Sequence, residues 1–250
     1  MINRRAFLTG CACCAAAGFT AAAQSVALPA PTLTAIAPGV WTHTTWSVVN
    51  NAPFAANGLV IEGARKLLLV DTGWTDSDSQ RILGLIGAVS RKPMICVGTH
   101  AHNDRIGGMG FLNARATPTW THEMTQEDAP ARRLPLARRS WRGASKHFDL
   151  GARRVEIFHP GPAHTRDNVV VWDRESRTLF GGCMIRDMSW TSLGNVADAN
   201  LPAWPASVAN LQQRYGARMV RLVPGHGQMG GGELLAHTRA LAEAAVASAH

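Results

Sequence analysis

The sequence predicts a single layered α/β domain, and three observations support this prediction. The chain has 250 residues, of which 46% are hydrophobic, and this is enough to bury one large core. Short β-branched and apolar runs alternate with amphipathic segments along most of the chain. The residues that could carry chemistry fall at the ends of predicted strands or in the loops that follow, which is where a layered α/β fold presents its site.

An export signal is predicted over residues 1–23, and the folded domain over residues 24–250. Arg4 and Arg5 precede an alanine-rich apolar stretch that ends in a small-residue cleavage site. The arginine pair resembles a twin-arginine signal, with the general secretion route as the alternative. Leu8-Thr9-Gly10-Cys11 resembles a lipoprotein processing box, but it lies too close to the arginine pair to follow the required apolar segment. We therefore expect a soluble periplasmic domain with no stable membrane association.

The domain is predicted to begin with β-strands and one helix. Alternating β-branched residues predict the first strand, and two apolar runs about a Glu-Gly-Ala turn predict the next two. Apolar residues at helical spacing predict a helix over 76–88, and a short buried strand follows it. Residues 45–56 are apolar and form either an exposed hairpin that covers a substrate or an ordinary hairpin. The strands predicted in this part are 40–44, 58–61, 66–70 and 93–97.

Strands and helices continue to alternate in the rest of the chain. Residues 116–150 show no periodic pattern, and we expect them to be irregular. A long loop is expected over 185–203, and an amphipathic helix closes the chain. The helices predicted here are 108–113, 205–215 and 232–247, and the strands are 154–158, 169–172, 178–180 and 219–223.

The loop after strand 93–97 contains two histidines two residues apart, with an aspartate two residues further on. Later strand ends and glycine-flanked turns add two more histidines and a cysteine. Three imidazoles form a catalytic zinc site with one position open for water. An aspartate, a cysteine and a histidine form a second site, where the thiolate favours zinc over magnesium or manganese. The expected ligands of the two Zn²⁺ ions are His100, His102 and His164, and Asp104, Cys183 and His226.

Other candidate residues receive structural interpretations. Asp71 ends a predicted strand and could be a metal ligand, but we expect it beneath the metal loop, bonded to backbone groups. His122 and His147 stand alone and are left out of the site, and Cys96 is interpreted as a small buried hydrophobe. Lys and Arg exceed Asp and Glu by 25 − 17 = 8. No aromatic residues are interleaved with this basic charge, so we expect a basic soluble surface and no nucleic-acid partner.

With their neighbours, these residues resemble the motifs of class B metallo-β-lactamases, in the subclass with a three-histidine site and an Asp-Cys-His site. The resemblance runs from about Leu33 to the C-terminal helix. Related hydrolases of the superfamily usually carry a histidine directly after the motif aspartate and lack the cysteine, whereas this chain has Arg105 and Cys183. The resemblance implies a four-layer αβ/βα sandwich with both zinc ions at one edge. The motifs are HAHNDR (100–105), GPAHTRDN (161–168), GGC (181–183), LGN (193–195), ADAN (197–200) and PGHG (224–227).

The resemblance also implies a role for each site residue. Asn195 and the three-histidine zinc would polarise the lactam carbonyl, and Asp104 would orient the attacking zinc-bound hydroxide. The Asp-Cys-His zinc would stabilise the departing nitrogen. Arg186 stands where the family has a lysine that holds the substrate carboxylate, and a guanidinium keeps that charge. Residues 46–54 correspond to a flexible loop over the substrate, so Trp46 and Phe54 are expected to contact it.

The function implied is that of a zinc-dependent β-lactamase, which hydrolyses penicillins, cephalosporins and carbapenems and confers antibiotic resistance. We expect a monomer whose partner is a small-molecule β-lactam. One alternative is a di-zinc hydrolase of an ester, thioester or phosphodiester, against which Arg105 and Cys183 argue. A second is a zinc-stabilised binding protein, which is disfavoured because three protein ligands plus an open position is the catalytic pattern.

Overall fold

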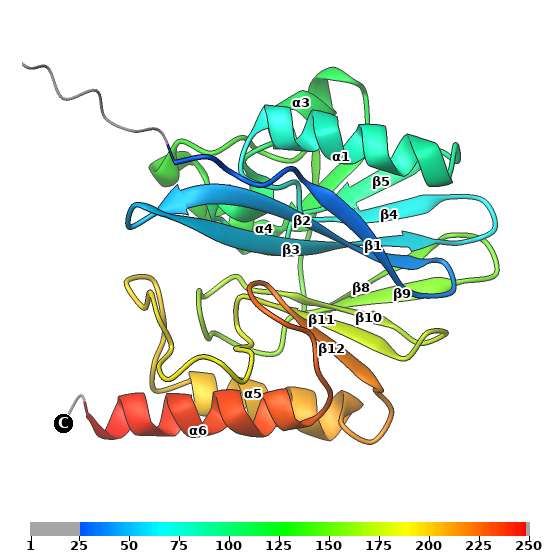
Figure 1. The fold of residues 1–250 in the computed structure, drawn as a ribbon. Helices are drawn as coiled ribbons and strands as arrows, with labels where there is room; N and C mark the ends of the chain where they lie inside the picture. Colours follow the sequence, from blue (N-terminus) through cyan, green and yellow to red (C-terminus); the bar gives the residue numbers. More distant parts are fainter. Residues whose placement is uncertain (1–25, 249–250) are drawn as a thin grey trace, which may run out of the picture.

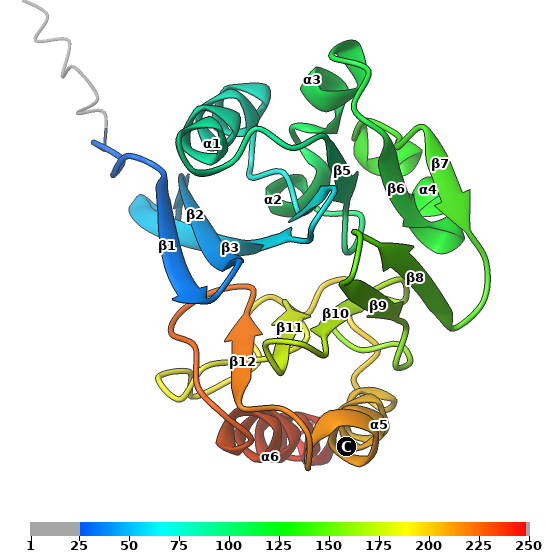
Figure 2. The ribbon, with the colours of Figure 1, turned by 90° about the vertical axis from the view of Figure 1, so that its right-hand side faces the viewer.

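The computed structural model describes residues 26–248, and its helices and strands form four layers. Two β-sheets pack face to face, and helices cover the outer face of each, as Figure 1 shows from the side and Figure 2 along a perpendicular direction. This arrangement confirms the predicted αβ/βα sandwich. The predicted export signal lies outside the described residues.

The first sheet has seven strands in the order of the sequence. Its first four strands are antiparallel neighbours, and the remaining pairs are parallel. The strands are β1 (Thr32–Ala37), β2 (Val40–Val49), β3 (Ala52–Glu62), β4 (Leu67–Val70), β5 (Met94–Val97), β6 (Thr119–His122) and β7 (Arg139–Trp141).

The second sheet has five strands in the order β12-β11-β10-β9-β8. All its pairs are antiparallel except β11 with β12, which run in parallel. The strands are β8 (Ser145–Asp149), β9 (Arg154–Phe158), β10 (Val170–Asp173), β11 (Thr178–Gly182) and β12 (Arg221–Pro224).

Helices lie on the outer faces of both sheets. On the first sheet, Thr75 caps α1 by accepting a hydrogen bond from the Asp78 amide, and acidic residues in the first turn complement the helix dipole. This capping explains why the helix begins where the sequence predicts. The helices are α1 (Asp76–Val89), α2 (Asn103–Ile106), α3 (Met109–Ala114), α4 (Glu123–Asp128), α5 (Trp204–Tyr215) and α6 (Glu233–Ala247).

Three clusters of buried hydrophobic side chains join the layers. The central one lies between the sheets and includes Leu68 and Val171, each fully buried. Ile82 belongs to the cluster beneath α1 and α3, and Leu211 to the cluster beneath α5 and α6. Each buried aliphatic side chain contributes roughly 1.5–3 kcal/mol, so the layers form a rigid support for the loops at their edges.

The expectation of an irregular segment over 116–150 is wrong. This segment contains β6, α4, a 3₁₀ turn at Pro130–Arg132, β7 and β8. Its strands are only three to five residues long and alternate poorly, because β7 and β8 are edge strands with exposed arginine and histidine side chains. Their pairing comes from the neighbouring strands and therefore leaves little trace in the local sequence.

Residues 45–56 form a regular hairpin between β2 and β3. The strands pair continuously from Val40↔Ile61 to Val49↔Ala52, and the two-residue turn consists of Asn50 and Asn51. Both turn residues have positive φ (50° and 60°), the conformation that a two-residue hairpin requires and asparagine tolerates. This segment is therefore a well-defined extension of the first sheet.

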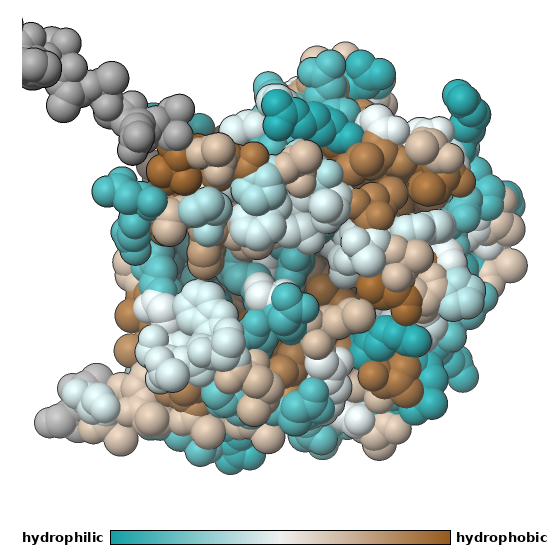
Figure 3. All heavy atoms as spheres, in the orientation of Figure 1, coloured by the Kyte–Doolittle hydropathy of each residue, from teal (hydrophilic) through white to brown (hydrophobic). Residues whose placement is uncertain are grey.

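Within residues 26–248 the structure contains no helix that is both long and apolar enough to cross a membrane. On the face drawn in Figure 3, hydrophilic and hydrophobic residues are interspersed, with one hydrophobic group at the upper right beside α1 and smaller ones at the upper left and lower right.

Candidate metal centre

Four strands end at the same edge of the sandwich and place their following loops side by side. The loops after β4 and β5 belong to the first sheet, and those after β11 and β12 to the second. The loop after β5 is held by two buried carboxylates: Asp71 accepts from the Thr99 amide (2.8 Å), and Asp167 accepts from the Ala101 amide (2.8 Å). The histidine motif therefore has a fixed backbone, as expected for Asp71 from the sequence.

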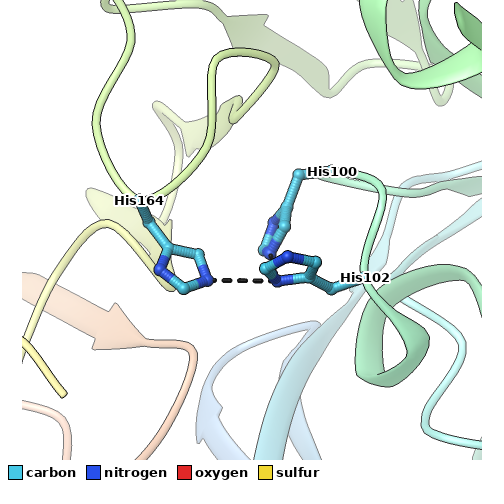
Figure 4. Close-up of side chains that lie close together, drawn as sticks. All are labelled: His100, His102 and His164. Carbon is cyan, nitrogen blue, oxygen red and sulfur yellow. Dashed lines mark hydrogen bonds between the residues drawn. The ribbon is translucent and has the colours of Figure 1, made fainter. Parts of the chain in front are cut away.

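The imidazoles of His100, His102 and His164 converge on one point (Figure 4). His102 Nδ1 lies 3.2 Å from both His100 Nε2 and His164 Nε2. His100 and His102 come from the loop after β5, and His164 from the loop between β9 and β10. The structure thus brings together three residues that the sequence separates by 64 positions.

Asp104, Cys183 and His226 form a second group beside the first. His226 Nε2 lies 3.3 Å from Cys183 Sγ and 3.3 Å from Asp104 Oδ2. His226 Nδ1 lies 2.6 Å from the Ala55 carbonyl oxygen, so Nδ1 carries the proton and Nε2 presents its lone pair to the group. Gly225 permits the close approach of this loop, because a Cβ there would lie 2.8 Å from Cys183 Sγ.

The protonation states of these groups suit metal binding. Burial lowers the pKa of His100 and His164 well below the usual value and that of His226 to about 4, so all three rings are neutral at pH 7. Burial also raises the pKa of the Cys183 thiol to about 12, which means that its thiolate needs a cation to form. A neutral imidazole set and a buried cysteine beside a carboxylate are the donors that zinc prefers. The residues present therefore fit two zinc ions.

Arg105 lies fully buried directly beneath the second group. Its guanidinium donates to the Asn57 carbonyl (2.7 Å) and the Gly225 carbonyl (3.0 Å), and it pairs with Asp71 (3.1 Å) and Asp104 (2.6 Å). Although burial acts in the opposite direction, the positive charge of Arg105 holds the pKa of Asp104 below its usual range. Arg105 thus keeps the Asp104 carboxylate ionised and in place.

A further chain of contacts leads away from the three histidines. His102 Nε2 lies 2.9 Å from Asp198 Oδ2, and Arg132 Nη1 donates to the same oxygen at 2.6 Å. The hydrogen bonds from Arg132 and His102 hold the pKa of Asp198 far below its usual range. Because Asp198 is ionised, it accepts the Nε2 proton of His102 and leaves the Nδ1 lone pair facing the other two histidines.

A cavity of about 860 Å³ opens above both groups. Its walls come from the β2–β3 hairpin on one side and from the loop 185–203 on the other, and Phe54 and Trp190 meet across it with ring centroids 6.3 Å apart. In Figure 1 the hairpin tip and this loop, drawn in yellow, both lie at the left-hand edge of the molecule. The lining residues include Phe54, Trp74, Asp104, Arg132, Cys183, Arg186, Trp190, Asn195 and Asp198.

Arg186 lines this cavity with a buried guanidinium. Its Nη2 donates to the Leu193 carbonyl at 2.5 Å, and the guanidinium carbon lies 4.8 Å from the ring centroid of Trp190 and 5.6 Å from that of Trp204. Burial lowers the pKa of Arg186, which still remains a cation at neutral pH because free arginine titrates above 12. Asn195 is exposed on the same loop, and its Oδ1 accepts from the Ala197 amide at 3.1 Å.

The structure does not bring Trp46 to this cavity. In the hairpin register Trp46 is opposite Ala55, whereas Phe54 is opposite Ser47, so Trp46 and Phe54 point to different faces. Trp46 instead lines a separate hollow with β1 residues such as Thr34. The expectation that Trp46 contacts the substrate is therefore corrected, and that for Phe54 stays a prediction.

Sequence reasoning missed several residues of the cavity. Trp74, Arg132 and Trp190 belong to no motif, and Asp198 lies within the ADAN motif, which by itself indicates no role for it. A possible signal for Trp74 was its position just beyond the strand end at Asp71, where site residues gather. His122 and His147 lie outside both groups, as expected: His122 caps α4, and His147 lies 3.9 Å from Glu156.

Comparisons with known proteins agree with this geometry. The model of the metallo-beta-lactamase superfamily matches residues 51–226. The metallo-beta-lactamase type 2 of Bacillus cereus is 36% identical over 200 residues, which cover 80% of this chain and 77% of that protein. The solved structure of TMB-1 superimposes with a TM-score of 0.83 at 33% identity, covering 87% of this chain and 99% of that one. The metallo-beta-lactamase FIM-1 of Pseudomonas aeruginosa, in a mono-zinc form, gives a TM-score of 0.78 at 38% identity, over 86% of this chain and 96% of its own.

Proposed function

Because this chain belongs to the metallo-beta-lactamase superfamily and is a zinc-dependent hydrolase acting on β-lactams, we propose that it opens the ring of penicillins, cephalosporins and carbapenems with two zinc ions. The observation that supports this proposal is the pair of ligand groups side by side on the floor of one cavity. The shared cavity places both groups within reach of one small substrate. Such an activity would confer resistance to these antibiotics.

We assign one ion to His100, His102 and His164 and the other to Asp104, Cys183 and His226. When bound, zinc polarises a carbonyl oxygen and lowers the pKa of water to near neutrality. Asp104 has a carboxylate that is ionised and held by Arg105 at 2.6 Å, so it is placed to accept a hydrogen bond from an attacking water and to orient it.

Two polar side chains on the cavity wall are assigned to substrate recognition. Asn195 uses its Oδ1 to bind the Ala197 amide, which leaves the Nδ2 hydrogens free to donate to a lactam carbonyl. Arg186 uses Nη2 for the Leu193 carbonyl, and because Arg186 lines the cavity, its guanidinium could give a substrate carboxylate a charge-assisted hydrogen bond. Removing this bond by Arg186→Gln should raise KM for substrates with a ring carboxylate; an unchanged KM would contradict the assignment.

The decisive experiment measures turnover of a chromogenic cephalosporin by the purified domain, with and without a chelator. We expect turnover that is abolished by chelation and restored by zinc, with about two zinc ions per chain. His164→Ala should remove activity, whereas His147→Ala, on β8, should not. A zinc-loaded chain that ignores every β-lactam but cleaves an ester, thioester or phosphodiester would overturn the proposal.

The location of the protein is also a proposal. The Arg4-Arg5 pair and the apolar stretch after it support export of the folded domain to the periplasm, where it would act as a monomer. Replacing both arginines by lysine should trap the precursor in the cytoplasm, because the twin-arginine pathway requires the arginine pair itself. Normal periplasmic recovery of this variant would indicate the general secretion route instead.

A further inference from the structure

Arg132 is linked to the candidate metal ligand His102 through one intermediate atom, Asp198 Oδ2. Among residues 26–248, no other basic residue has such a one-atom link through a residue outside the two ligand groups. Its Nη1 lies 2.6 Å from Asp198 Oδ2, and that same oxygen lies 2.9 Å from His102 Nε2. Arg132 and Asp198 are separated by 66 positions in the sequence. The contact therefore joins two segments of the chain at the edge of the three-histidine group.

The two segments differ in how firmly they are held. Arg132 ends the 3₁₀ turn that follows α4, and its amide donates to the Ala129 carbonyl at 3.1 Å. Arg133 then adopts a left-handed conformation (φ 57°) and closes the turn with a hydrogen bond to the Pro130 carbonyl. The backbone of Arg132 is therefore well defined.

Asp198, in contrast, lies in an exposed stretch of the loop 185–203. Residues 194–198 are all exposed, and Val196 retains 37% of its accessible surface. Two guanidinium groups hold the ends of this stretch: Arg186 binds the Leu193 carbonyl, and Arg132 binds the Asp198 carboxylate. Backbone hydrogen bonds from the Ala199 and Asn200 amides hold the chain just beyond Asp198. The exposed Asp198 carboxylate itself is held by the contacts with Arg132 and His102, so its orientation depends on Arg132.

We propose that Arg132 is a positioning residue for the three-histidine site, which it serves by clamping Asp198 against His102. With Asp198 in place, His102 keeps its proton on Nε2 and its Nδ1 lone pair faces His100 and His164. The inference depends on the proposed function only in that these histidines hold zinc. Arg132 touches neither the metal ligands' donor atoms nor, in this role, the substrate.

The positive charge of Arg132 lowers metal affinity, whereas its positioning of Asp198 raises it. A cation near a divalent metal ion repels it, and removing that cation would favour binding. However, Arg132 is paired with a carboxylate, and its side chain retains 33% of its accessible surface, so solvent and the partner screen the repulsion. We therefore expect loss of positioning to dominate when Arg132 is removed.

The test is competition between the zinc-loaded protein and a chelator, which reports metal affinity without a β-lactam. Arg132→Gln should lower the affinity for one of the two zinc ions about 5- to 10-fold. This is less than the 10- to 100-fold loss of affinity expected for Asp198→Asn, which removes the Asp198 carboxylate itself. If Arg132 acts through Asp198, the double variant Arg132→Gln/Asp198→Asn should bind zinc as tightly as Asp198→Asn alone, to within about twofold. Arg132→Lys should recover part of the loss.

Cobalt substitution assigns the effect to one site. Only the Asp104–Cys183–His226 group contains a cysteine, so the cobalt titration that produces the thiolate-to-cobalt absorption band should be unchanged in Arg132→Gln. Cobalt binding that adds nothing to this band should weaken about 5- to 10-fold. Arg239→Gln is the matched control, because Arg239 pairs with Glu243 at 2.8 Å on the surface of α6 and should leave metal binding unchanged. Unfolding of the metal-free Arg132→Gln protein should match the wild type.

Two results would overturn the inference. One is zinc binding in Arg132→Gln that is as tight as in the wild type or tighter, and the other is a double variant in which the two losses multiply. A wild-type chain that binds zinc but turns over no β-lactam would contradict the proposed function and leave this inference standing. A wild-type chain that binds no zinc would overturn both.

Discussion

Neighbouring charges hold a ligand in each of the two groups: Arg105 pairs with Asp104 at 2.6 Å, and Asp198 Oδ2 lies 2.9 Å from His102 Nε2. The six expected metal ligands could be predicted because strand ends and glycine-flanked turns place their side chains at one edge of an α/β fold, and the structure brings all six into two groups. Trp46 could not be placed, because the face to which it points depends on hairpin register. Arg132 was missed because its contact with Asp198 joins segments 66 positions apart.

Cys183→Ser tests the assignment of two zinc ions. A serine hydroxyl is not ionised at neutral pH and is a harder ligand than zinc prefers, so the Asp104–His226 group should lose its ion. The zinc content should fall from about two to about one, the three-histidine group being the catalytic-type site that remains. Turnover should fall by roughly 10²–10³, the value typical of losing a group that stabilises developing negative charge. Metal analysis and steady-state kinetics measure both; a variant that keeps two zinc ions and full turnover shows that Cys183 is not a ligand.

The burial of His43, which belongs to neither metal group, predicts that the stability of the fold depends on pH. The ring is fully buried, its Nε2 lies 2.9 Å from the Val70 carbonyl, and burial lowers its pKa to about 4. The unfolded chain binds the proton near pH 6.5, so the stabilisation is fully present above pH 6.5 and is lost as the pH falls to about 4. A shift of this size corresponds to about 3 kcal/mol.

The His43 prediction is best measured as a difference between two metal-free proteins. His43→Gln keeps a donor near the Val70 carbonyl but does not titrate, so the gap in unfolding free energy between wild type and variant should narrow by about 3 kcal/mol from pH 7.5 to pH 4. The buried histidines of the metal groups titrate in the same direction in both proteins and cancel. Denaturant unfolding at several pH values measures the gap, and parallel stability curves would show that His43 takes up its proton without cost.

At the scale of elements, long periodic segments were predicted well and short edge strands were not. The helix expected over 76–88 is α1, and the helix over 205–215 is α5, because each has a continuous apolar face and a defined start. The strands within 116–150 escaped prediction, since each is only three to five residues long and β7 and β8 lie at the edges of their sheets. The sequence of residues 45–56 is compatible with a substrate-covering hairpin or an ordinary one, and the hairpin register decides which side chains face the cavity.

The two faces of this hairpin give an element-scale prediction. Phe54 contacts the cavity, with its ring centroid 4.5 Å from that of His226 and 6.3 Å from those of Trp74 and Trp190. Phe54→Ala removes this aromatic wall and should lower kcat/KM about tenfold, mainly through a higher KM, since lost apolar contact with a ligand is typically worth about 1–2 kcal/mol. Trp46→Ala, on the opposite face, should leave KM unchanged. Equal effects of the two variants on KM would mean that the hairpin acts through its stability and not through Phe54.

At the scale of the whole molecule, two buried arginines join the two halves of the sandwich at opposite edges. Arg105 links the first half to the Gly225 carbonyl beneath the metal groups. Arg153 donates to Asp173 in the second half with Nε (3.0 Å) and Nη2 (2.6 Å), and to the Glu62 carbonyl in the first half with Nη1 (2.8 Å). Gly39, at φ 67°, leaves the space for this guanidinium, because a Cβ there would lie 2.7 Å from Nη1. The sequence marked Arg105 by its motif, but Arg153 carries no local signal.

Substitutions of these two arginines should differ in their effect on zinc, because Arg105 contacts a metal group and Arg153 lies at the opposite edge. Arg153→Gln leaves the fully buried Asp173 without its cation, and removing one partner of a buried ion pair costs about 3–5 kcal/mol of unfolding free energy. Burial alone would raise the pKa of Asp173, and the hydrogen bonds from Arg153 and Ser176 hold it below its usual range, so this stabilisation is lost as the pH falls through the acidic range. Arg105→Gln should lower the free energy of unfolding by a similar amount and also change the zinc content, since Arg105 contacts Asp104. Arg153→Gln, in contrast, should keep both zinc ions and wild-type kcat/KM at temperatures where it remains folded. Denaturant unfolding, metal analysis and kinetics on the same preparations decide the matter: an Arg153→Gln protein that loses zinc or turnover while still folded would show that the edge opposite the site is coupled to it.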